Sequence, residues 1–473
     1  MPGSERQQVV DAAKYLRGVR PLDPDELSEY VAGGAHPAVV ARILREEAVA
    51  LDLVERANGT FAPVPDETLT PDFDGVGRFP EAYADAFEAR LLDAYGRDWH
   101  AGDTGDAIRE RIRRLKTDYY WRNDVAYDAD VAMAYACYHL PDAYAAVAYA
   151  LHELGRDGLL DRRLRVLDVG AGVGGPALAV NDYVLGGPGD PEREALVEYH
   201  AVEPSDAATV FGDLVDETGP NFHPELHREV AEEFAPEGEY DLILFANVLN
   251  ELDAPADTAA RYLDALAPDG TMLAVAPADR ETSTGLRGVE REIADERDAA
   301  TIHAPMPRFW PNQRPTDRGW SFDERPDLEP PAFQQRLASG AEDPGAYLRT
   351  AVRYSWTALR TDGRRRFDMR LDRSTAAPLG ESERHVTERV DHVVAKASHD
   401  LSESEGHPLY KVSDGSEDTE HYAVLVNETA LNRLLADAGY GDPMRIENAL
   451  TLWNDDEEAY NLVVDEEAVV DPA

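Results

Sequence analysis

Three glycines that alternate after an apolar run are the residues best suited to receive a ligand. Residues 166–174 read Val-Leu-Asp-Val-Gly-Ala-Gly-Val-Gly, which places a carboxylate at Asp168 and glycines at Gly170, Gly172 and Gly174. The pattern predicts a buried parallel strand, a tight turn and a helix. Because glycine has no Cβ, a ligand could lie against this backbone, next to the amides of the helix start.

The carboxylate decides between possible ligands. Gly170, Gly172 and Gly175 also fit the dinucleotide pattern Gly-x-Gly-x-x-Gly, so NAD, FAD and a purely structural turn stay open as alternatives. A carboxylate two residues before the first glycine would crowd a pyrophosphate. It suits the ammonium of a cofactor that carries an amino acid. Asp168 therefore favours S-adenosylmethionine.

A second acidic residue stands at the end of the next predicted strand. Residues 196–203 predict this strand, and Glu203 could accept hydrogen bonds from both ribose hydroxyls of a nucleoside. The separation of Glu203 from Gly170 exceeds the roughly 20 residues that separate the glycine motif from the acidic residue in a βαβ unit without an insertion. The polar run 186–191 predicts an inserted loop that accounts for the excess.

The downstream elements predict an α/β fold around these residues. Strands are expected at 240–246, which ends at Asn247, and at 270–277, and an antiparallel hairpin at 351–360 and 365–371. Alternating β/α units followed by a hairpin are typical of the seven-stranded, Rossmann-like sheet of class I methyltransferases. Ligands bind at the carboxyl ends of such strands, where the candidate cofactor residues fall: Asp168, Glu203 and Asn247.

The flanks predict further modules. Three helices and a hairpin near Asn58-Gly59 indicate a winged-helix-like module, and a strand-strand-strand-helix-strand-strand order near the C-terminus indicates an OB-fold-like β-barrel. The expected divisions are a winged-helix-like module at 1–65, a helical region at 66–160, the methyltransferase domain at 161–373 with an insertion at about 300–345, and the barrel at 383–466.

The excess of acidic residues and the single cysteine predict a cytoplasmic protein adapted to high salt. The chain has 93 acidic and 46 basic residues and a net charge of −47, with the acidic residues spread along its length. A hydrated surface adapted to high salt is the plain interpretation. Cys137 is the one cysteine, which suits a reducing compartment and excludes cysteine-clustered metal sites. No apolar run approaches the ~20 residues of a membrane span, so no membrane partner is expected.

We hypothesise that the source organism is a halophile that keeps salt inside its cells. The acidic excess should then make the fold and the solubility depend on multimolar KCl, because salt screens the repulsion between carboxylates. Circular dichroism and light scattering across a KCl series would measure this dependence. Full retention of fold and solubility in dilute buffer would contradict the hypothesis.

Five cations are candidates for RNA contact. Arg109, Arg113 and Lys116 share one face of a predicted helix, and Lys396 and Lys411 fall on strands near the face that OB-folds use for oligonucleotides. Intramolecular salt bridges explain the first group equally well, and a purely stabilising barrel explains the second.

The catalytic residues stay unknown. The segment after the strand at 240–246 reads Asn247-Val-Leu-Asn250-Glu251, without the prolines and aromatic residue of amino-group methyltransferases. Cys137 precedes the first strand, so no cysteine is placed to attack a cytosine. No lysine lies between residues 117 and 395 for ribose methylation. Asn247, Asn250 and Glu251 could shape the pocket or cap the following helix.

Linked segments between residues 135 and 365 carry a family resemblance. The chain resembles the mitochondrial small-ribosomal-subunit assembly family of methyltransferase-like proteins, which has bacterial and archaeal members. The segments are Leu140–Ala146, Val166–Gly174, Glu203–Ser205, Ala246–Leu252, Ala276-Pro277, His303–Pro307 and Tyr354–Trp356.

The resemblance implies S-adenosylmethionine as cofactor and binding to the small ribosomal subunit or its rRNA during maturation, with catalytic turnover left open. A non-catalytic assembly factor and a small-molecule methyltransferase are the alternatives. The family carries cysteines in the insertion, which imply a metal or iron–sulfur centre. Here Ala304, Met306 and Ser321 stand in that neighbourhood. We therefore expect no iron–sulfur cluster, no zinc and no other metal.

Overall fold

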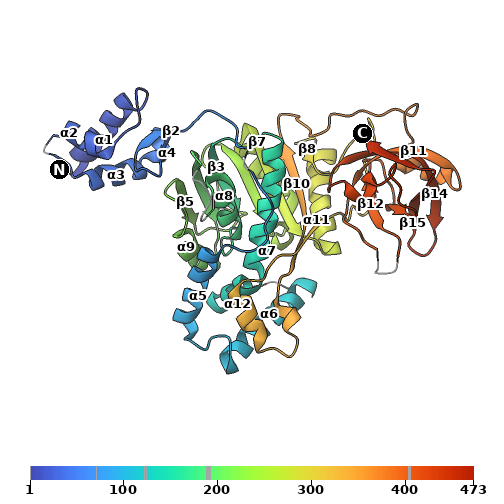
Figure 1. Ribbon diagram of the computed structural model, residues 1–473, viewed down its shortest axis with the longest axis horizontal. Helices are drawn as coiled ribbons and strands as arrows, with labels where there is room; N and C mark the ends of the chain where they lie inside the picture. Colours follow the sequence, from blue (N-terminus) through green and yellow to red (C-terminus); the bar gives the residue numbers. More distant parts are fainter. Residues whose placement is uncertain are drawn as a thin grey trace. The chain divides into compact units, whose positions relative to one another are not determined.

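The structure is a computed structural model that describes residues 2–32, 34–70, 72–121, 123, 125–187, 193–402 and 406–473. The chain divides into two compact units, residues 1–246 with 327–350 and residues 247–326 with 351–473. Figure 1 labels the helices and strands of both units. Most of the loop expected at 186–191 lies outside the described residues. Among the described helices, none combines the length and apolar character needed to cross a membrane.

The first unit begins with a small helical module. Its elements are α1 (Pro2–Leu16), α2 (Pro24–Tyr30), α3 (Pro37–Glu46), α4 (Ala48–Leu51), β1 (Leu53–Glu55) and β2 (Phe61–Pro63), and β1 and β2 pair antiparallel. The side chain of Asp23 accepts a hydrogen bond from the Asp25 amide at 2.9 Å, and Pro24 opens α2, as its start signal predicts. The expected N-terminal helical region is confirmed.

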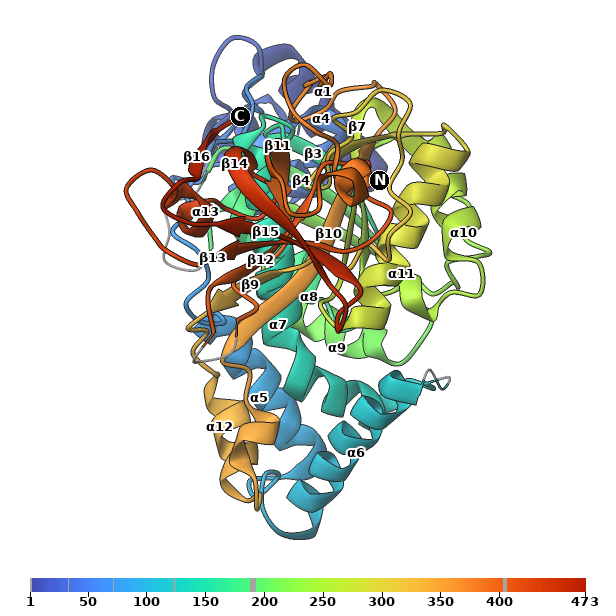
Figure 2. The same ribbon diagram turned by 90° about the vertical axis from the view of Figure 1, so that its right-hand side faces the viewer.

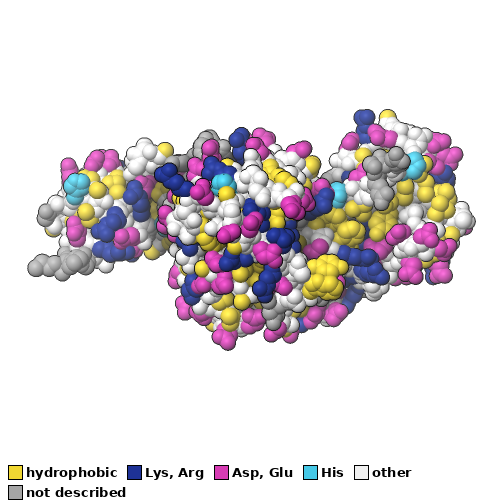
Figure 3. All heavy atoms as spheres, turned by 90° about the horizontal axis from the view of Figure 1, so that it is seen from below, with side chains coloured by type: hydrophobic (Ala, Val, Ile, Leu, Met, Phe, Trp, Pro, Cys, Tyr) yellow, Lys and Arg dark blue, Asp and Glu magenta, His cyan; other side chains and the backbone are white. Residues whose placement is uncertain are grey.

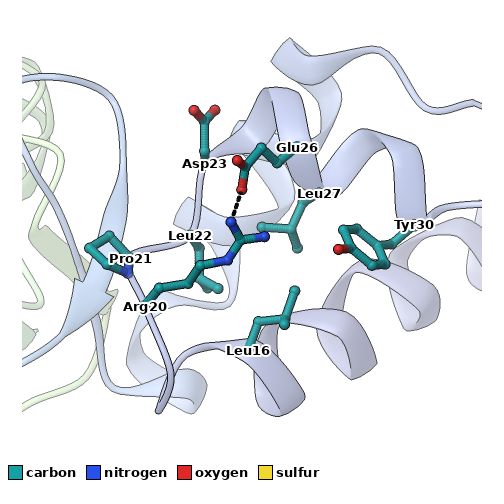
Figure 4. A pocket seen from close by; sticks show the side chains of 8 residues that line it. All are labelled: Leu16, Arg20, Pro21, Leu22, Asp23, Glu26, Leu27 and Tyr30. Atoms are coloured by element: carbon teal, nitrogen blue, oxygen red, sulfur yellow. Dashed lines mark ion pairs between the residues drawn. The ribbon is translucent and has the colours of Figure 1, made fainter.

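A shallow recess lies where α1 and α2 meet (Figure 4). Leu16 and Leu27 form its apolar wall, and an ion pair between Arg20 and Glu26 at 2.7 Å crosses it. Both charged side chains are nearly half exposed, so this pair contributes little to stability. The recess is too small to receive a nucleoside.

Three helices connect this module to the sheet: α5 (Glu81–Tyr95), α6 (Gly102–Trp121) and α7 (Ala129–Arg156). The predicted insertion does not stay together, because its later part belongs to this unit. Helix α12 (Ala332–Ser339) packs against α5 and α7. The Gln334 amide on α12 donates to the carbonyls of Cys137 at 3.0 Å and Tyr138 at 3.2 Å.

A parallel sheet forms the centre of the first unit, in the order β5 (Phe222–His227), β4 (Leu196–Val202), β3 (Arg163–Val169), β6 (Tyr240–Ala246). The last four residues of β3 and β4 are all buried, as expected for parallel strands covered on both faces. Helix α8 (Gly175–Leu185) follows β3 and packs on α7, and α9 (Ala207–Val215) follows β4.

The second unit contains antiparallel strands and the C-terminal barrel. The strands are β7 (Leu266–Pro277), β8 (Thr301–Ala304), β9 (Asp323–Pro326) and β10 (Ala351–Arg360), and β10 pairs antiparallel with the other three. The helices are η1 (Leu249–Glu251), α10 (Pro255–Tyr262), η2 (Leu263–Ala265), α11 (Arg280–Arg291) and η3 (Glu292–Glu296). Among the described residues, eight strands, β3 to β10, make up the mixed α/β Rossmann-like core, which confirms the predicted fold class.

The predicted partner of β10 is wrong. Residues 365–371 form no strand, because β7, β8 and β9 already pair with β10. The alternating apolar residues of this segment are real but serve packing. Phe367, Met369 and Leu371 lie against a buried cluster that includes Phe309 and Trp310.

The barrel matches its prediction closely. Strands β11 (Arg389–Lys396), β12 (Leu409–Ser413), β13 (His421–Leu425), β14 (Pro443–Asn454) and β15 (Ala459–Val464) close in the order β11-β12-β13-β15-β14-β11 (red in Figure 2). Strands β13 and β15 are parallel, α13 (Leu434–Asp437) stands between β13 and β14, and β16 (Val469–Pro472) adds to β14. This is the strand order of an OB-fold.

Acidic side chains are dispersed over the surface. Figure 3 shows magenta carboxylates across the whole visible face, interspersed with basic and uncharged side chains rather than gathered in one region. The distribution agrees with the spread of acidic residues along the sequence. It matches a hydrated surface rather than one acidic docking patch.

Candidate functional site

The glycine loop has the shape that only glycine adopts without strain. Gly170, Gly172 and Gly174 have φ values of +77°, +54° and +97°, all in the left-handed region. The end of β4 holds the loop, because the Gly170 and Ala171 amides donate to the Val202 carbonyl at 2.9 and 3.1 Å. The space beside Gly172 is open, since a Cβ there would meet only the Gly170 carbonyl at 4.0 Å. The loop is therefore preformed for a ligand.

Glu203 lies directly after β4 and fastens the same loop. One carboxylate oxygen accepts the Gly172 amide at 2.9 Å, and the other accepts the Ser205 amide at 2.9 Å and the Ser205 hydroxyl at 2.5 Å. The side chain is largely buried. A carboxylate has about four acceptor positions, so capacity remains for the hydroxyls of a ribose. The structure places Glu203 and the glycine loop together, as predicted.

Asp168 is strongly perturbed by its burial. Its side chain is fully buried, and one oxygen accepts the Tyr199 hydroxyl at 2.7 Å. The other oxygen has no hydrogen-bond partner among the described residues. Burial raises the pKa of Asp168 to about 7; the Tyr199 hydrogen bond opposes this shift, and the charge of Glu203 adds to it. An acceptor without a donor is costly in this position unless a ligand supplies one.

The residues therefore fit an amino-acid-bearing nucleoside. The buried oxygen of Asp168 that lacks a partner among the described residues can accept from an ammonium, the loop can lie against the ligand, and Glu203 can accept from ribose hydroxyls. A pyrophosphate would bring further negative charge next to two carboxylates, which electrostatics disfavours. The donor and acceptor set thus favours S-adenosylmethionine over a dinucleotide.

Two contributors to this site were not predicted. Tyr199 on β4 and Ser205 after it donate to Asp168 and Glu203 respectively. A signal for Tyr199 existed, since a hydroxyl inside an otherwise apolar strand needs a buried acceptor. Its partner could not be assigned without the register, which pairs Asp168 with Ala201 and so places Tyr199 diagonally across.

Asn247 follows the last residue of β6 in the chain and belongs to the second unit. It has a φ of +60°, and its amide donates to the Val275 carbonyl at 2.8 Å. The suggested capping role is wrong. The residues before η1 and α10 are Val248 and Ala254, and neither helix has a side-chain cap. A cofactor contact by Asn247 stays a prediction.

Three of the five RNA-contact candidates are buried, which corrects the expectation of exposed cations. Arg109 donates to the Leu337 carbonyl at 2.7 Å and to Asp106 at 2.7 Å. Lys396 donates to the carbonyls of Ala436 and Ala438 at 2.9 and 2.8 Å, and burial lowers its pKa to about 8.

Lys411, the third buried candidate, contacts Asp317 at 3.2 Å and also pairs with Glu420. Lys116 is partly buried, donates to the Ala346 carbonyl and lies 3.8 Å from the centre of the Tyr138 ring. Arg113 is exposed and pairs with Glu110 at 3.0 Å. Of the five candidates, Arg113 is thus the one whose cation faces solvent.

Family comparisons agree with the core. Residues 139–329 match the model of a methyltransferase domain, which includes β3, the glycine loop and Glu203. Residues 6–57 match the N-terminal domain, and residues 380–473 the C-terminal domain, of a family described as a domain of unknown function, DUF8157. The comparison with curated proteins gave no match. The match supports a methyltransferase domain in this part of the chain and, with it, S-adenosylmethionine as the cofactor.

Solved methyltransferases resemble parts of the chain. An S-adenosylmethionine-dependent methyltransferase from Clostridium acetobutylicum is 12% identical over 32% of this chain and 52% of its own, with a TM-score of 0.22. The glycopeptide N-methyltransferase MtfA is 22% identical over 28% and 54%, with a TM-score of 0.21. The chain thus spans about half the length of these two. The mitomycin 7-O-methyltransferase MmcR is 17% identical over 65% and 91%, with a TM-score of 0.27.

Proposed function

We propose that this chain is an S-adenosylmethionine-dependent methyltransferase that acts on or at the rRNA of the small ribosomal subunit during its biogenesis. The observation that carries the proposal is a closed barrel with OB-fold strand order in the same chain as a methyltransferase domain. OB-folds bind oligonucleotides across their strands 2 and 3, which correspond here to β12 and β13. The resemblance to the ribosome-assembly family points to the same partner.

The bound cofactor would supply an electrophilic methyl group, and the described residues would hold it. Asp168 would accept the ammonium, Glu203 the ribose hydroxyls, and the glycine loop would allow close approach of the backbone. Orientation of the methyl group toward the acceptor is the main contribution such a site can make without a dedicated base.

A small-molecule substrate is the second candidate, and one observation favours it. Arg109, Lys396 and Lys411 are buried and bonded inside the protein, so they offer no positive charge to a phosphate backbone. Nucleic-acid affinity depends on such charge. A non-catalytic assembly role would follow if the cofactor binds without turnover.

Methyl transfer into rRNA tests the proposal directly. The purified chain, S-adenosylmethionine with a radioactive methyl group and immature small subunits should give label in 16S rRNA at high KCl. The Asp168→Ala variant is the matched control and should give none. When a small-molecule cell extract is added as a second acceptor, label that moves from S-adenosylmethionine to an extract compound and not to rRNA would establish the second candidate. Stable association with small subunits without any label would establish the assembly role.

A further inference from the structure

Two histidines and a glutamate gather on one face of the edge of the parallel sheet. His200 lies on β4, and Glu225 and His227 lie on β5, the outermost strand of the first unit in Figure 1. The register pairs His200 with Glu225 and Val202 with His227, so all three side chains project from the same face. Their ligand atoms lie within 4.8 Å of one another.

The spacing of these atoms suits a small transition-metal ion. Nδ1 of His200 is 3.1 Å from Nε2 of His227 and 3.7 Å from a carboxylate oxygen of Glu225. Zinc–nitrogen bonds of about 2.0–2.1 Å in a tetrahedron separate two ligand nitrogens by roughly 3.3 Å. The Glu225 side chain is 66% exposed and can adjust its rotamer to complete such a geometry. The two imidazole nitrogens are already close to this separation.

A further carboxylate orients the central histidine. Nε2 of His200 is 3.0 Å from a carboxylate oxygen of Glu198, which also accepts from Arg165 at 3.0 Å. A proton held on Nε2 by this bond leaves Nδ1 as a lone pair aimed at His227. Carboxylates in this position fix the tautomer of metal-binding histidines and raise their basicity.

From this arrangement we propose that His200, Glu225 and His227 bind a divalent transition-metal ion, with zinc the best fit. Two imidazoles and one carboxylate are a zinc ligand set that leaves a fourth position for water. The His200 side chain is 9% exposed, whereas Glu225 faces solvent, so the ion has a rigid inner support and an open entry. The proposal replaces the expectation of no zinc, which rested on the lack of cysteines.

The site would join the outer strand to its neighbour close to the cofactor residues. The backbone amide of Glu203 donates to the His227 carbonyl at 3.0 Å, so β4 and β5 are already fastened at this end. A metal ion would add side-chain bonds to the same pair of strands. Without the ion, one shared proton between the two histidines would account for their contact.

Cobalt(II) spectroscopy distinguishes these two cases. The metal-free full chain is titrated with Co²⁺, because imidazole-bound tetrahedral cobalt absorbs visible light far more strongly than octahedral cobalt on surface carboxylates. This contrast matters in a chain with 93 acidic residues. One strongly absorbing equivalent, displaced by Zn²⁺, is expected. Weak absorption that never saturates would overturn the proposal.

Variants assign the ligands. His227→Ala should remove the strong absorption, and Glu198→Gln should weaken Co²⁺ binding by about 10–100-fold. His385→Ala is the matched control, since His385 contacts Glu388 at 3.3 Å but belongs to no three-ligand group among the described residues. It should leave binding unchanged. Equal binding by His227→Ala and the unaltered chain would contradict the assignment.

Thermal unfolding gives a readout independent of spectroscopy and enzymatic turnover. Zn²⁺ should raise the Tm of the unaltered chain because it binds the folded state. His227→Gln preserves more of the side-chain volume and should fold with a metal-free Tm close to that of the unaltered chain, but its Tm should not respond to Zn²⁺. A Tm increase of the same size in both proteins would place the stabilising ion elsewhere and reject the site.

Discussion

Asp168→Ala abolishes binding of S-adenosylmethionine while the fold persists. The substitution removes the buried oxygen that has no other partner, so the cofactor ammonium would enter a buried position without a counter-charge. Losing one partner of a buried ion pair costs about 3–5 kcal/mol, which corresponds to at least about a 100-fold loss of affinity. Isothermal titration at high KCl measures this loss, with NADH as a non-cognate ligand.

Asp414→Ala is the matched control for the loss of a buried carboxylate. Asp414 is also fully buried, accepts from Trp310 at 2.7 Å, and has a pKa that burial raises to about 7, but it lies in the barrel. Its substitution should leave cofactor affinity within about twofold, because its hydrogen-bond partners Trp310, Leu379 and Ser416 all belong to the second unit. Unchanged affinity of Asp168→Ala for S-adenosylmethionine would contradict the proposal that Asp168 binds the cofactor.

The pH dependence follows from the raised pKa of Asp168. The pairing requires the ionised carboxylate, so cofactor affinity should rise about tenfold between pH 6 and pH 8. Stability of the metal- and cofactor-free chain responds in the opposite direction. Because the folded-state pKa exceeds the unfolded value of 3.8, the contribution of protonated Asp168 is complete below pH 3.8 and declines up to about pH 7. Asp168→Asn should lack both dependences.

The sequence predicts the positions of the candidate cofactor residues well because these positions depend on local order. A buried strand, alternating glycines and an acidic residue at the next strand end are encoded over short spans, and the structure brings Glu203 and Gly172 into contact. Strand β5 escaped prediction for a physical reason. It is an edge strand, so Pro224 and exposed polar residues are tolerated and no apolar pattern forms.

The burial of the lysines could not be read from the sequence. Alternation of apolar and polar residues along β12 predicts which side chains face the barrel interior and which face outward. It does not predict whether another part of the chain covers the outward face. Lys411 is covered in this way by Asp317, which lies 94 residues earlier, within the insertion. Segment 365–371 illustrates the converse, because its alternation was genuine but β10 had no free edge to pair with it.

Lys411→Met destabilises the protein by about 3–5 kcal/mol rather than weakening a surface contact. The lysine is 2% exposed and contacts Asp317 at 3.2 Å and Glu420, and Arg291 also pairs with Asp317 at 2.5 Å. Removing the cation leaves buried carboxylates undercompensated, which is far more costly than losing an exposed pair. Denaturant unfolding followed by tryptophan fluorescence measures the change.

The control is Arg384→Met, whose side chain is 73% exposed and pairs with Glu381 at 3.1 Å. Its cost should stay below about 1 kcal/mol. Converting Asp317 to Asn and Glu420 to Gln in the Lys411→Met background should recover part of the loss, because both unpaired charges are then removed. Unchanged stability in Lys411→Met, combined with weaker RNA binding, would instead restore Lys411 as a nucleic-acid contact.

The ion pairs around Lys411 should make the stability of the protein fall at acidic pH. Burial alone would raise the pKa of Asp317, but the charges of Lys411 and Arg291 outweigh it, so this pKa lies below its usual value of 3.8. The stabilisation is therefore present above pH 3.8 and is lost as the pH falls through the folded-state pKa. Lys411→Met should move that loss to higher pH, whereas Arg384→Met should not, because only the first removes a charge that holds Asp317 ionised.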